Sequence, residues 1–129
     1  FLQTLQHMGK SMCVATMTDR MHAEVALRTH HIDPYFSFIK TVSEVGKGKE
    51  FPDIYLQAAA ELGFMPERCL VVEDSAVACK VARNAGFLVC GVYDSEYACI
   101  ETEMRQTCHC FVHNLLELLP REEKAGNSN

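Results

Sequence analysis

Two acidic residues, Glu73 and Asp74, stand side by side directly after the apolar run 70–72. Adjacent carboxylates repel each other and resist burial, so either water or a cation must face them. Mg²⁺ is commonly bound in proteins by one or two carboxylates and takes its other ligands from water and phosphate oxygens. The pair is therefore a candidate Mg²⁺ site, and the alternative is two solvated acids at the end of a strand.

A hydroxyl group and ammonium groups occur in two other stretches of the chain. Thr16 comes directly after the apolar run 12–15, and Lys47 and Lys49 lie in the loop before Pro52. Phosphoryl transfer depends mostly on positioning and on positive charge held against the phosphoryl oxygens. Taken singly, Thr16 could be a helix cap and Lys49 an ordinary loop lysine. Placed at one edge of a sheet together with the two acids, they indicate a phosphate site.

Short apolar runs that alternate with amphipathic stretches must position these side chains. The runs predict strands at 12–15, 36–42, 69–72, 87–93 and 110–113. The stretches between them predict helices at 1–7, 19–30, 52–62, 75–86, 95–106 and 114–119. Strands that are apolar throughout and alternate with helices predict an α/β fold, a Rossmann-like parallel sheet with helices on both faces. Such sheets bind ligands at the carboxyl ends of their strands.

Size and charge restrict the class of protein. The chain has 129 residues, enough for one domain, which we expect to span 1–119 and to be followed by a polar tail, 120–129. Its net charge is −5, its pI is about 5.6 and its basic residues are scattered, so no nucleic-acid partner is expected. No apolar run approaches the length of a membrane span, so no membrane partner is expected either.

Seven cysteines, an odd number, are spread through the predicted strands and helices. This distribution is not typical of a disulfide framework, and it favours reduced cysteines in a cytoplasmic protein. One cluster, Cys108, His109 and Cys110 with His113, has metal-ligand chemistry. It lacks a convincing second ligand pair at a usual spacing, so a strand of mixed residues is favoured over a zinc site.

Three stretches resemble the motifs of one enzyme family. They are MCVATMTDR at 12–20, GKGKEFPDIYLQAAAELG at 46–63 and CLVVEDSAVACKVARNAG at 69–86. In this order and spacing they resemble the second, third and fourth motifs of the haloacid dehalogenase superfamily of phosphohydrolases, in its branch of phosphatases and β-phosphoglucomutase-like enzymes. The resemblance extends over residues 1 to about 119.

The resemblance implies a role for each matched residue. Thr16 and the backbone N–H of Met17 would bind a phosphoryl oxygen of a small phosphorylated metabolite. Lys49 would neutralise phosphate charge and pair with the nucleophile or with Glu73, and Thr16 and Lys49 are the expected catalytic residues. Asp74 would ligate Mg²⁺, and Glu73 would ligate the ion or orient a water bound to it.

The nucleophile of the family has no counterpart in the sequence. It is the first Asp of an Asp-x-Asp motif at the end of the first strand, and the chain contains no Asp-x-Asp. The resemblance implies that this motif and the cap that selects the substrate lie upstream of Phe1, in a missing N-terminal segment of the same protein. In the family the first strand lies between the strand of Thr16 and that of Glu73. We therefore expect a gap with unpaired strand edges there, and an inactive isolated chain.

Four functions follow from these observations, and one is favoured. The leading hypothesis is the C-terminal part of a Mg²⁺-dependent phosphatase that acts on a small phosphorylated metabolite through a phospho-aspartyl intermediate. The alternatives are a phosphomutase of the same fold, a truncated relative without catalytic activity, and an unrelated doubly wound domain. The last is disfavoured because no Gly-rich phosphate loop follows a strand, and GKGKE at 46–50 has the wrong spacing.

Overall fold

The computed structural model describes residues 1–121, so all but the first two positions of the predicted tail 120–129 lie outside the described residues. The α-helices are α1 (Leu2–His7), α2 (Arg20–Thr29), α3 (Val42–Val45), α4 (Asp53–Leu62), α5 (Ala76–Asn84) and α6 (Glu101–Thr107). The strands are β1 (Val14–Thr16), β2 (Ile39–Thr41), β3 (Leu70–Glu73), β4 (Leu88–Val92) and β5 (Cys110–Val112). Short 3₁₀ helices are η1 (Asp33–Tyr35), η2 (Pro66–Arg68), η3 (Ser95–Ile100) and η4 (Leu115–Leu118).

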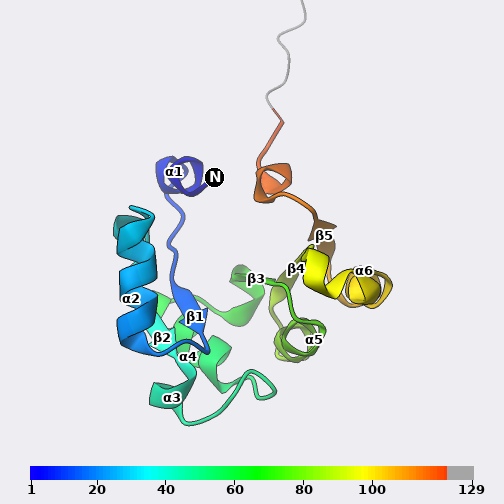
Figure 1. Ribbon diagram of the computed structural model, residues 1–129, viewed down its shortest axis with the longest axis horizontal. Helices are drawn as coiled ribbons and strands as arrows, with labels where there is room; N and C mark the ends of the chain where they lie inside the picture. The colour runs from blue at the N-terminus through cyan, green and yellow to red at the C-terminus, as the bar shows by residue number, and fades with distance from the viewer. Residues whose placement is uncertain (122–129) are drawn as a thin grey trace, which may run out of the picture.

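The described strands form two parallel sheets (Figure 1). β1 pairs with β2, from Val14 opposite Ile39 to Thr16 opposite Thr41. In the second sheet β4 lies between β3 and β5. Parallel strands that alternate with helices make this an α/β, Rossmann-like fold, as predicted. Within the described residues no pairing joins β1 to β3, so the two sheets are separated at the place where the gap is expected.

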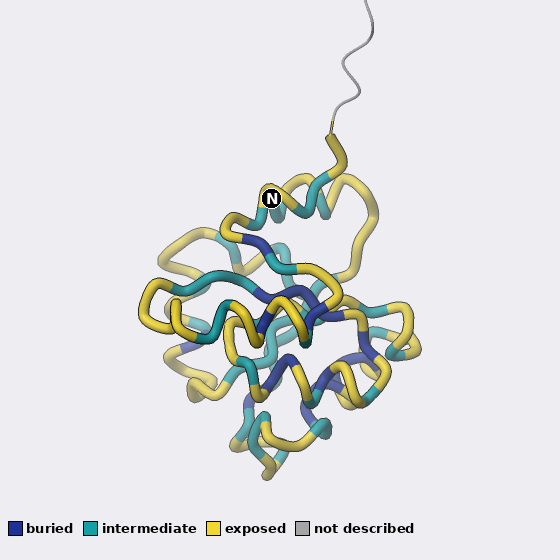
Figure 2. The backbone as a smooth tube through the Cα atoms, turned by 90° about the vertical axis from the view of Figure 1, so that its right-hand side faces the viewer, coloured by how far each residue is buried: buried dark blue, intermediate teal, exposed yellow. Residues whose placement is uncertain are grey.

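Helix α4 connects the two sheets. It packs on β1 and β2, and its residues Ile54 and Tyr55 belong to the same buried core as side chains of α5 and β4. Helix α5 packs on β3 and β4, α6 on β5, and α2 on β2. Figure 2 shows the buried segments gathered in the interior, whereas α1 carries no buried residue. The position of α4 therefore determines how the ends of β1 and β3 are related.

Local sequence signals set the ends of the two helices next to the acidic pair. Pro52 precedes α4, at the place where its missing N–H costs least. Gly63 ends α4 with a φ of 85°, in the left-handed region that glycine adopts without strain. The Ser75 hydroxyl caps α5 by accepting a hydrogen bond from the Ala78 N–H at 3.3 Å. These signals agree with the helices predicted at 52–62 and 75–86.

The strand predicted at 36–42 is shorter in the structure. Only β2, Ile39–Thr41, is extended and paired, and α3 begins directly after it. Residues 36–38 at the start of the run are not part of the strand, and Thr41 sets its C-terminal end, because its buried hydroxyl accepts a hydrogen bond from the Glu44 N–H at 3.3 Å and so caps α3. A capping residue inside an alternating run thus ended the strand early.

Two predicted helices have a different form. Segment 95–106 consists of the 3₁₀ helix η3, which is interrupted by the non-helical conformation of Tyr97, and the α-helix α6 that follows it. The helix predicted at 114–119 is the 3₁₀ helix η4, which begins with a capping box of Asn114 and Glu117. The 3₁₀ helix η3 comes close to the acidic pair, because its residues Tyr97 and Ile100 line a small recess together with Asp74.

Strand β3 is less buried than predicted. Leu70 is 48% and Val72 41% exposed, and Leu88 on the same face of β4 is 46% exposed. The prediction of a strand buried on both faces is therefore wrong for β3. The described helices α5 and α6 pack against the other face, where Val71 and Val89 join the core.

None of the described helices has the length and apolarity needed to cross a bilayer. The cytoplasmic location stays a prediction.

Candidate active site

The acidic pair stands where β3 ends, and its two members differ in burial. Glu73 is the last residue of β3 and only 9% of its side chain is exposed, whereas Asp74 is exposed. Ser75 follows and caps α5. The junction of strand and helix therefore presents one carboxylate held inside the protein and one open to solvent.

Two donors reach the same oxygen of Glu73. Lys49 Nζ forms an ion pair with Oε1, and only 17% of the Lys49 side chain is exposed. The Tyr55 hydroxyl donates to Oε1 over 2.7 Å. The Lys49 ammonium also lies 5.9 Å from the centre of the Tyr55 ring, a distance typical of a cation–π contact. The three side chains form one polar cluster in which the negative charge of Glu73 is compensated.

Tyr55 is the residue of this cluster that the sequence motifs did not predict. It lies on α4 with 4% of its surface exposed, and its ring packs edge-on against Phe87 with 6.2 Å between ring centres. Burial, together with the negative charge of Glu73, raises the pKa of Tyr55, so the hydroxyl stays protonated and acts as a donor. One sequence signal was available. Tyr55 shares a helical face with Ala58 and Ala59, and a buried tyrosine hydroxyl needs a partner.

The two lysines of the loop between α3 and α4 have different surroundings. Lys49 contacts Glu73. Lys47 is 52% exposed, its ammonium lies 3.9 Å from Oδ2 of Asp53, and it sits 5.0 Å from the centre of the Phe51 ring. Only Lys49 is therefore held at the end of β3, and Lys47 offers a matched comparison for variants of Lys49.

Thr16 and Met17 stand at the end of the other sheet. Thr16 is the last residue of β1, and its hydroxyl accepts a hydrogen bond from the Thr18 N–H at 3.0 Å. The alternative role of Thr16 as a helix cap is wrong, because the Asp19 side chain caps α2. Met17 is 72% exposed. No hydrogen bond of the described residues joins Thr16 to Lys49, Glu73 or Asp74. The structure therefore brings Lys49 and the two acids together at the end of β3. Thr16 and Met17 remain at the end of β1, in the other sheet.

The donor atoms of the acidic pair can be compared with the needs of a metal ion. Within residues 1–121 no group of three or more His, Cys, Asp or Glu side chains is arranged to hold a metal ion. Glu73 and Asp74 supply two hard oxygen donors, which suits Mg²⁺ when water and phosphate supply its remaining ligands. This donor set fits Mg²⁺ bound together with a phosphate, and it does not fit a closed zinc site.

The two histidines near the C-terminal strand have separate partners. Nδ1 of His109 accepts a hydrogen bond from the Val89 N–H at 3.0 Å. The His113 ring stacks on Tyr93 with 4.3 Å between ring centres, and its Nε2 lies 3.3 Å from a carboxylate oxygen of Glu101. Both rings are thus engaged in contacts within the fold.

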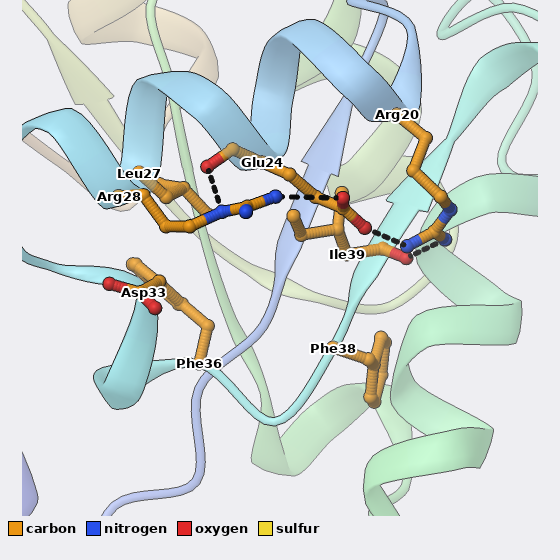
Figure 3. Close-up of a pocket in the computed structure, with 8 residues that line it drawn as sticks. All are labelled: Arg20, Glu24, Leu27, Arg28, Asp33, Phe36, Phe38 and Ile39. Atoms are coloured by element: carbon orange, nitrogen blue, oxygen red, sulfur yellow. Dashed lines mark hydrogen bonds and ion pairs between the residues drawn. The ribbon is translucent and has the colours of Figure 1, made fainter.

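A pocket of about 380 Å³ opens between α2 and β2 (Figure 3). Glu24 lies between Arg20 and Arg28 and pairs with both. Arg20 also donates to the Ile39 carbonyl at 2.6 Å, which covers part of the free edge of β2. None of the predicted site residues lines this pocket, whereas Asp74 borders a recess of about 10 Å³ at the end of β4. The charged pocket is therefore separate from the candidate site.

Comparison with protein families decides which family the chain belongs to. The family described as haloacid dehalogenase-like hydrolase matches residues 1–86, a segment that contains Thr16, Lys49, Glu73 and Asp74. The chain belongs to the haloacid dehalogenase-like hydrolase family. The resemblance seen in the three sequence motifs is thereby confirmed.

Haloacid dehalogenase-like relatives include a phosphatase and a mutase. The phosphorylated carbohydrates phosphatase of Thermotoga maritima is 33% identical over 75 residues, which is 58% of this chain and 35% of that protein. The solved structure of a putative β-phosphoglucomutase from Thermotoga maritima is 28% identical, with a TM-score of 0.74. The match covers 86% of this chain and 51% of the mutase chain. A family hydrolase from Deinococcus radiodurans R1, solved with bound phosphate and sodium, is 26% identical with a TM-score of 0.76, over 91% of this chain and 53% of that one. The chain thus spans about half the length of these two solved structures, and 35% of the length of the phosphorylated carbohydrates phosphatase.

Proposed function

We propose that the chain is the C-terminal part of a Mg²⁺-dependent phosphatase that hydrolyses a small phosphorylated metabolite. The observation that carries the proposal is the ion pair of Lys49 with Glu73, next to Asp74 at the end of β3. It places an ammonium group and two carboxylates at one strand end, where parallel sheets bind their ligands. Membership of the haloacid dehalogenase-like hydrolases and the likeness to a phosphorylated carbohydrates phosphatase support it.

In this proposal each site residue acts on the phosphate or on its counter-ion. Lys49 neutralises charge on the phosphoryl oxygens, and the Thr16 hydroxyl and Met17 backbone N–H donate hydrogen bonds to one of them. Glu73 and Asp74 would hold Mg²⁺, which when bound supplies positive charge against the phosphoryl group. The pairing of Lys49 with Glu73 keeps the ammonium at the strand end, where it needs little reorganisation to meet a phosphate.

The attacking group comes from outside the 129 residues, because they contain no Asp-x-Asp. In the family pattern the first Asp of that motif attacks the phosphorus and forms a phospho-aspartyl intermediate, which water then hydrolyses. The proposal places this Asp in an N-terminal segment of the same protein, at the end of a strand lying between β1 and β3. The pairing of the described strands supports this position, because β1 pairs only with β2 and β3 only with β4, so each has an edge that an inserted strand could pair with.

A phosphomutase of the same fold is the second candidate. The likeness to a putative β-phosphoglucomutase favours it, at 28% identity and a TM-score of 0.74. Both reactions use the same phosphate contacts, so the site residues alone do not separate them. Release of inorganic phosphate distinguishes the two reactions. A phosphatase liberates inorganic phosphate in every turnover, whereas a mutase transfers the phosphoryl group back to the substrate. A relative without catalytic activity would do neither.

The proposal is tested on the full-length protein, with its upstream coding sequence. Lys49→Ala and Asp74→Ala are each expected to abolish hydrolysis of p-nitrophenyl phosphate, because each removes a charge needed to hold the phosphoryl group. Lys47→Ala is the matched control. It should keep near wild-type turnover, since Lys47 is 52% exposed and faces Asp53 instead. Near-normal turnover in Lys49→Ala or Asp74→Ala would overturn the proposal.

A further inference from the structure

The carboxylate of Glu73 uses its two oxygens unequally. Oε1 accepts both the Lys49 ion pair and the hydrogen bond from Tyr55 at 2.7 Å. Among residues 1–121 no hydrogen-bond donor contacts Oε2. Two charge-assisted contacts from different elements, a loop and a helix, fix the rotation of the carboxylate group. Oε2 is therefore the oxygen that remains for another ligand.

Tyr55 is the rigid member of the two donors. It projects from α4, is 4% exposed, and its ring is packed against Phe87 in the main core. A tyrosine ring is positioned by only two torsions, whereas the Lys49 ammonium ends a flexible stem that projects from a loop. The Tyr55 hydroxyl therefore determines which oxygen of Glu73 is engaged from within the protein.

We propose that Tyr55 is a positioning residue of the metal site: by holding Oε1 of Glu73, it leaves Oε2 available to Mg²⁺ beside Asp74. The inference rests on the proposed function and adds to it a residue that contacts neither the metal nor the phosphate. Hydrogen bonds to metal-binding carboxylates orient the ligand, and their loss commonly weakens metal affinity or activity by about 10–100-fold. If Tyr55 only filled the core, its hydroxyl would contribute to stability and not to metal affinity.

The test compares Tyr55→Phe with wild type in the full-length protein, because phenylalanine keeps the ring and its contact with Phe87. Calorimetric titration with Mg²⁺ should show affinity reduced by about tenfold. Turnover should fall at low Mg²⁺ and recover when Mg²⁺ is saturating, since the phosphate contacts are intact. Tyr35→Phe is the matched control. Tyr35 is partly buried in η1, its hydroxyl bonds no described residue, and its loss should change neither quantity.

A second variant separates positioning from packing. In a Glu73→Ala background, Tyr55→Phe should leave Mg²⁺ affinity unchanged, because the group that Tyr55 positions is gone. An equal loss in both backgrounds, or a Tyr55→Phe protein that does not fold, would assign Tyr55 a structural role and overturn the inference. Unchanged affinity in Tyr55→Phe, while the wild type binds Mg²⁺ and hydrolyses phosphate, would overturn the inference alone. A wild-type protein that neither binds Mg²⁺ nor releases phosphate would overturn the proposed function, and the inference with it.

Discussion

Replacing Lys49 with methionine removes the ammonium and keeps most of the apolar side chain, so the change isolates one charge. It leaves Glu73, whose side chain is 9% exposed, with Tyr55 as its remaining described donor. Removing one partner of a buried ion pair typically costs roughly 3–5 kcal/mol, because the other charge stays buried. The hydrogen bond from Tyr55 and the partial exposure of Lys49 reduce that cost. We expect a loss of about 2 kcal/mol in the free energy of unfolding.

Urea unfolding of the full-length protein measures this loss as a lower midpoint at constant m-value. Lys47→Met is the matched control, because it breaks a pair 3.9 Å apart whose side chains are 52% and 37% exposed. Exposed pairs contribute little, so a loss below about 0.5 kcal/mol is expected there.

The double variant Lys49→Met/Glu73→Gln tests the cause of the effect. It should recover roughly half of the stability lost in Lys49→Met, because the uncompensated charge is removed along with its partner. Equal midpoints for Lys49→Met and Lys47→Met would refute the reasoning that Glu73 depends on Lys49 for charge compensation. An additive loss in the double variant would refute it as well.

Two further predictions concern the isolated chain and its thiols. Residues 1–129 alone should show no single cooperative urea transition as a monomer, because β1 and β3 are unpaired across the break; a cooperative transition of ordinary size would contradict this. In the native full-length protein at about pH 8, iodoacetamide should alkylate exposed Cys99 before Cys90, since burial raises the pKa of Cys90 to about 12 and the thiolate is the nucleophile. Mass spectrometry of peptides follows both sites, and equal labelling rates would show that β4 is not buried as described.

The parts of the fold that follow from short-range chemistry could be predicted from the sequence. Pro52 and Gly63 bound α4 and Ser75 caps α5 because each acts through its own backbone or a neighbour within a turn. The apolar run that ends at Glu73 is likewise a strand, as its composition indicates. The ion pair of Glu73 with Lys49 joins residues far apart in the chain, and it was expected only as one of two pairings that the family resemblance implies.

What could not be predicted depends on tertiary packing. Tyr55 reads as a core residue of an amphipathic helix, and its hydroxyl finds Glu73 only because α4 lies against the end of β3. The sequence predicts that Leu70 and Val72 are buried. They are half exposed, because the described helices cover the other face of their sheet. Thr41 belongs to an alternating run, yet its hydroxyl caps α3 and ends β2. In each case a partner distant in sequence, or a competing local hydrogen bond, overrode the pattern.

The charges of the site explain why the two acids have such different surroundings. Lys49 compensates Glu73, so the exposed Asp74 carries the negative charge of this trio that has no partner within it. A phosphate dianion that approached this edge alone would meet an ammonium already paired and a carboxylate that repels it. The proposed function therefore requires that a cation share the two carboxylates before phosphate is held tightly. In the folded chain Lys49 compensates Glu73, and in the proposed function it would also face the phosphate, with Glu73 and Asp74 holding the cation.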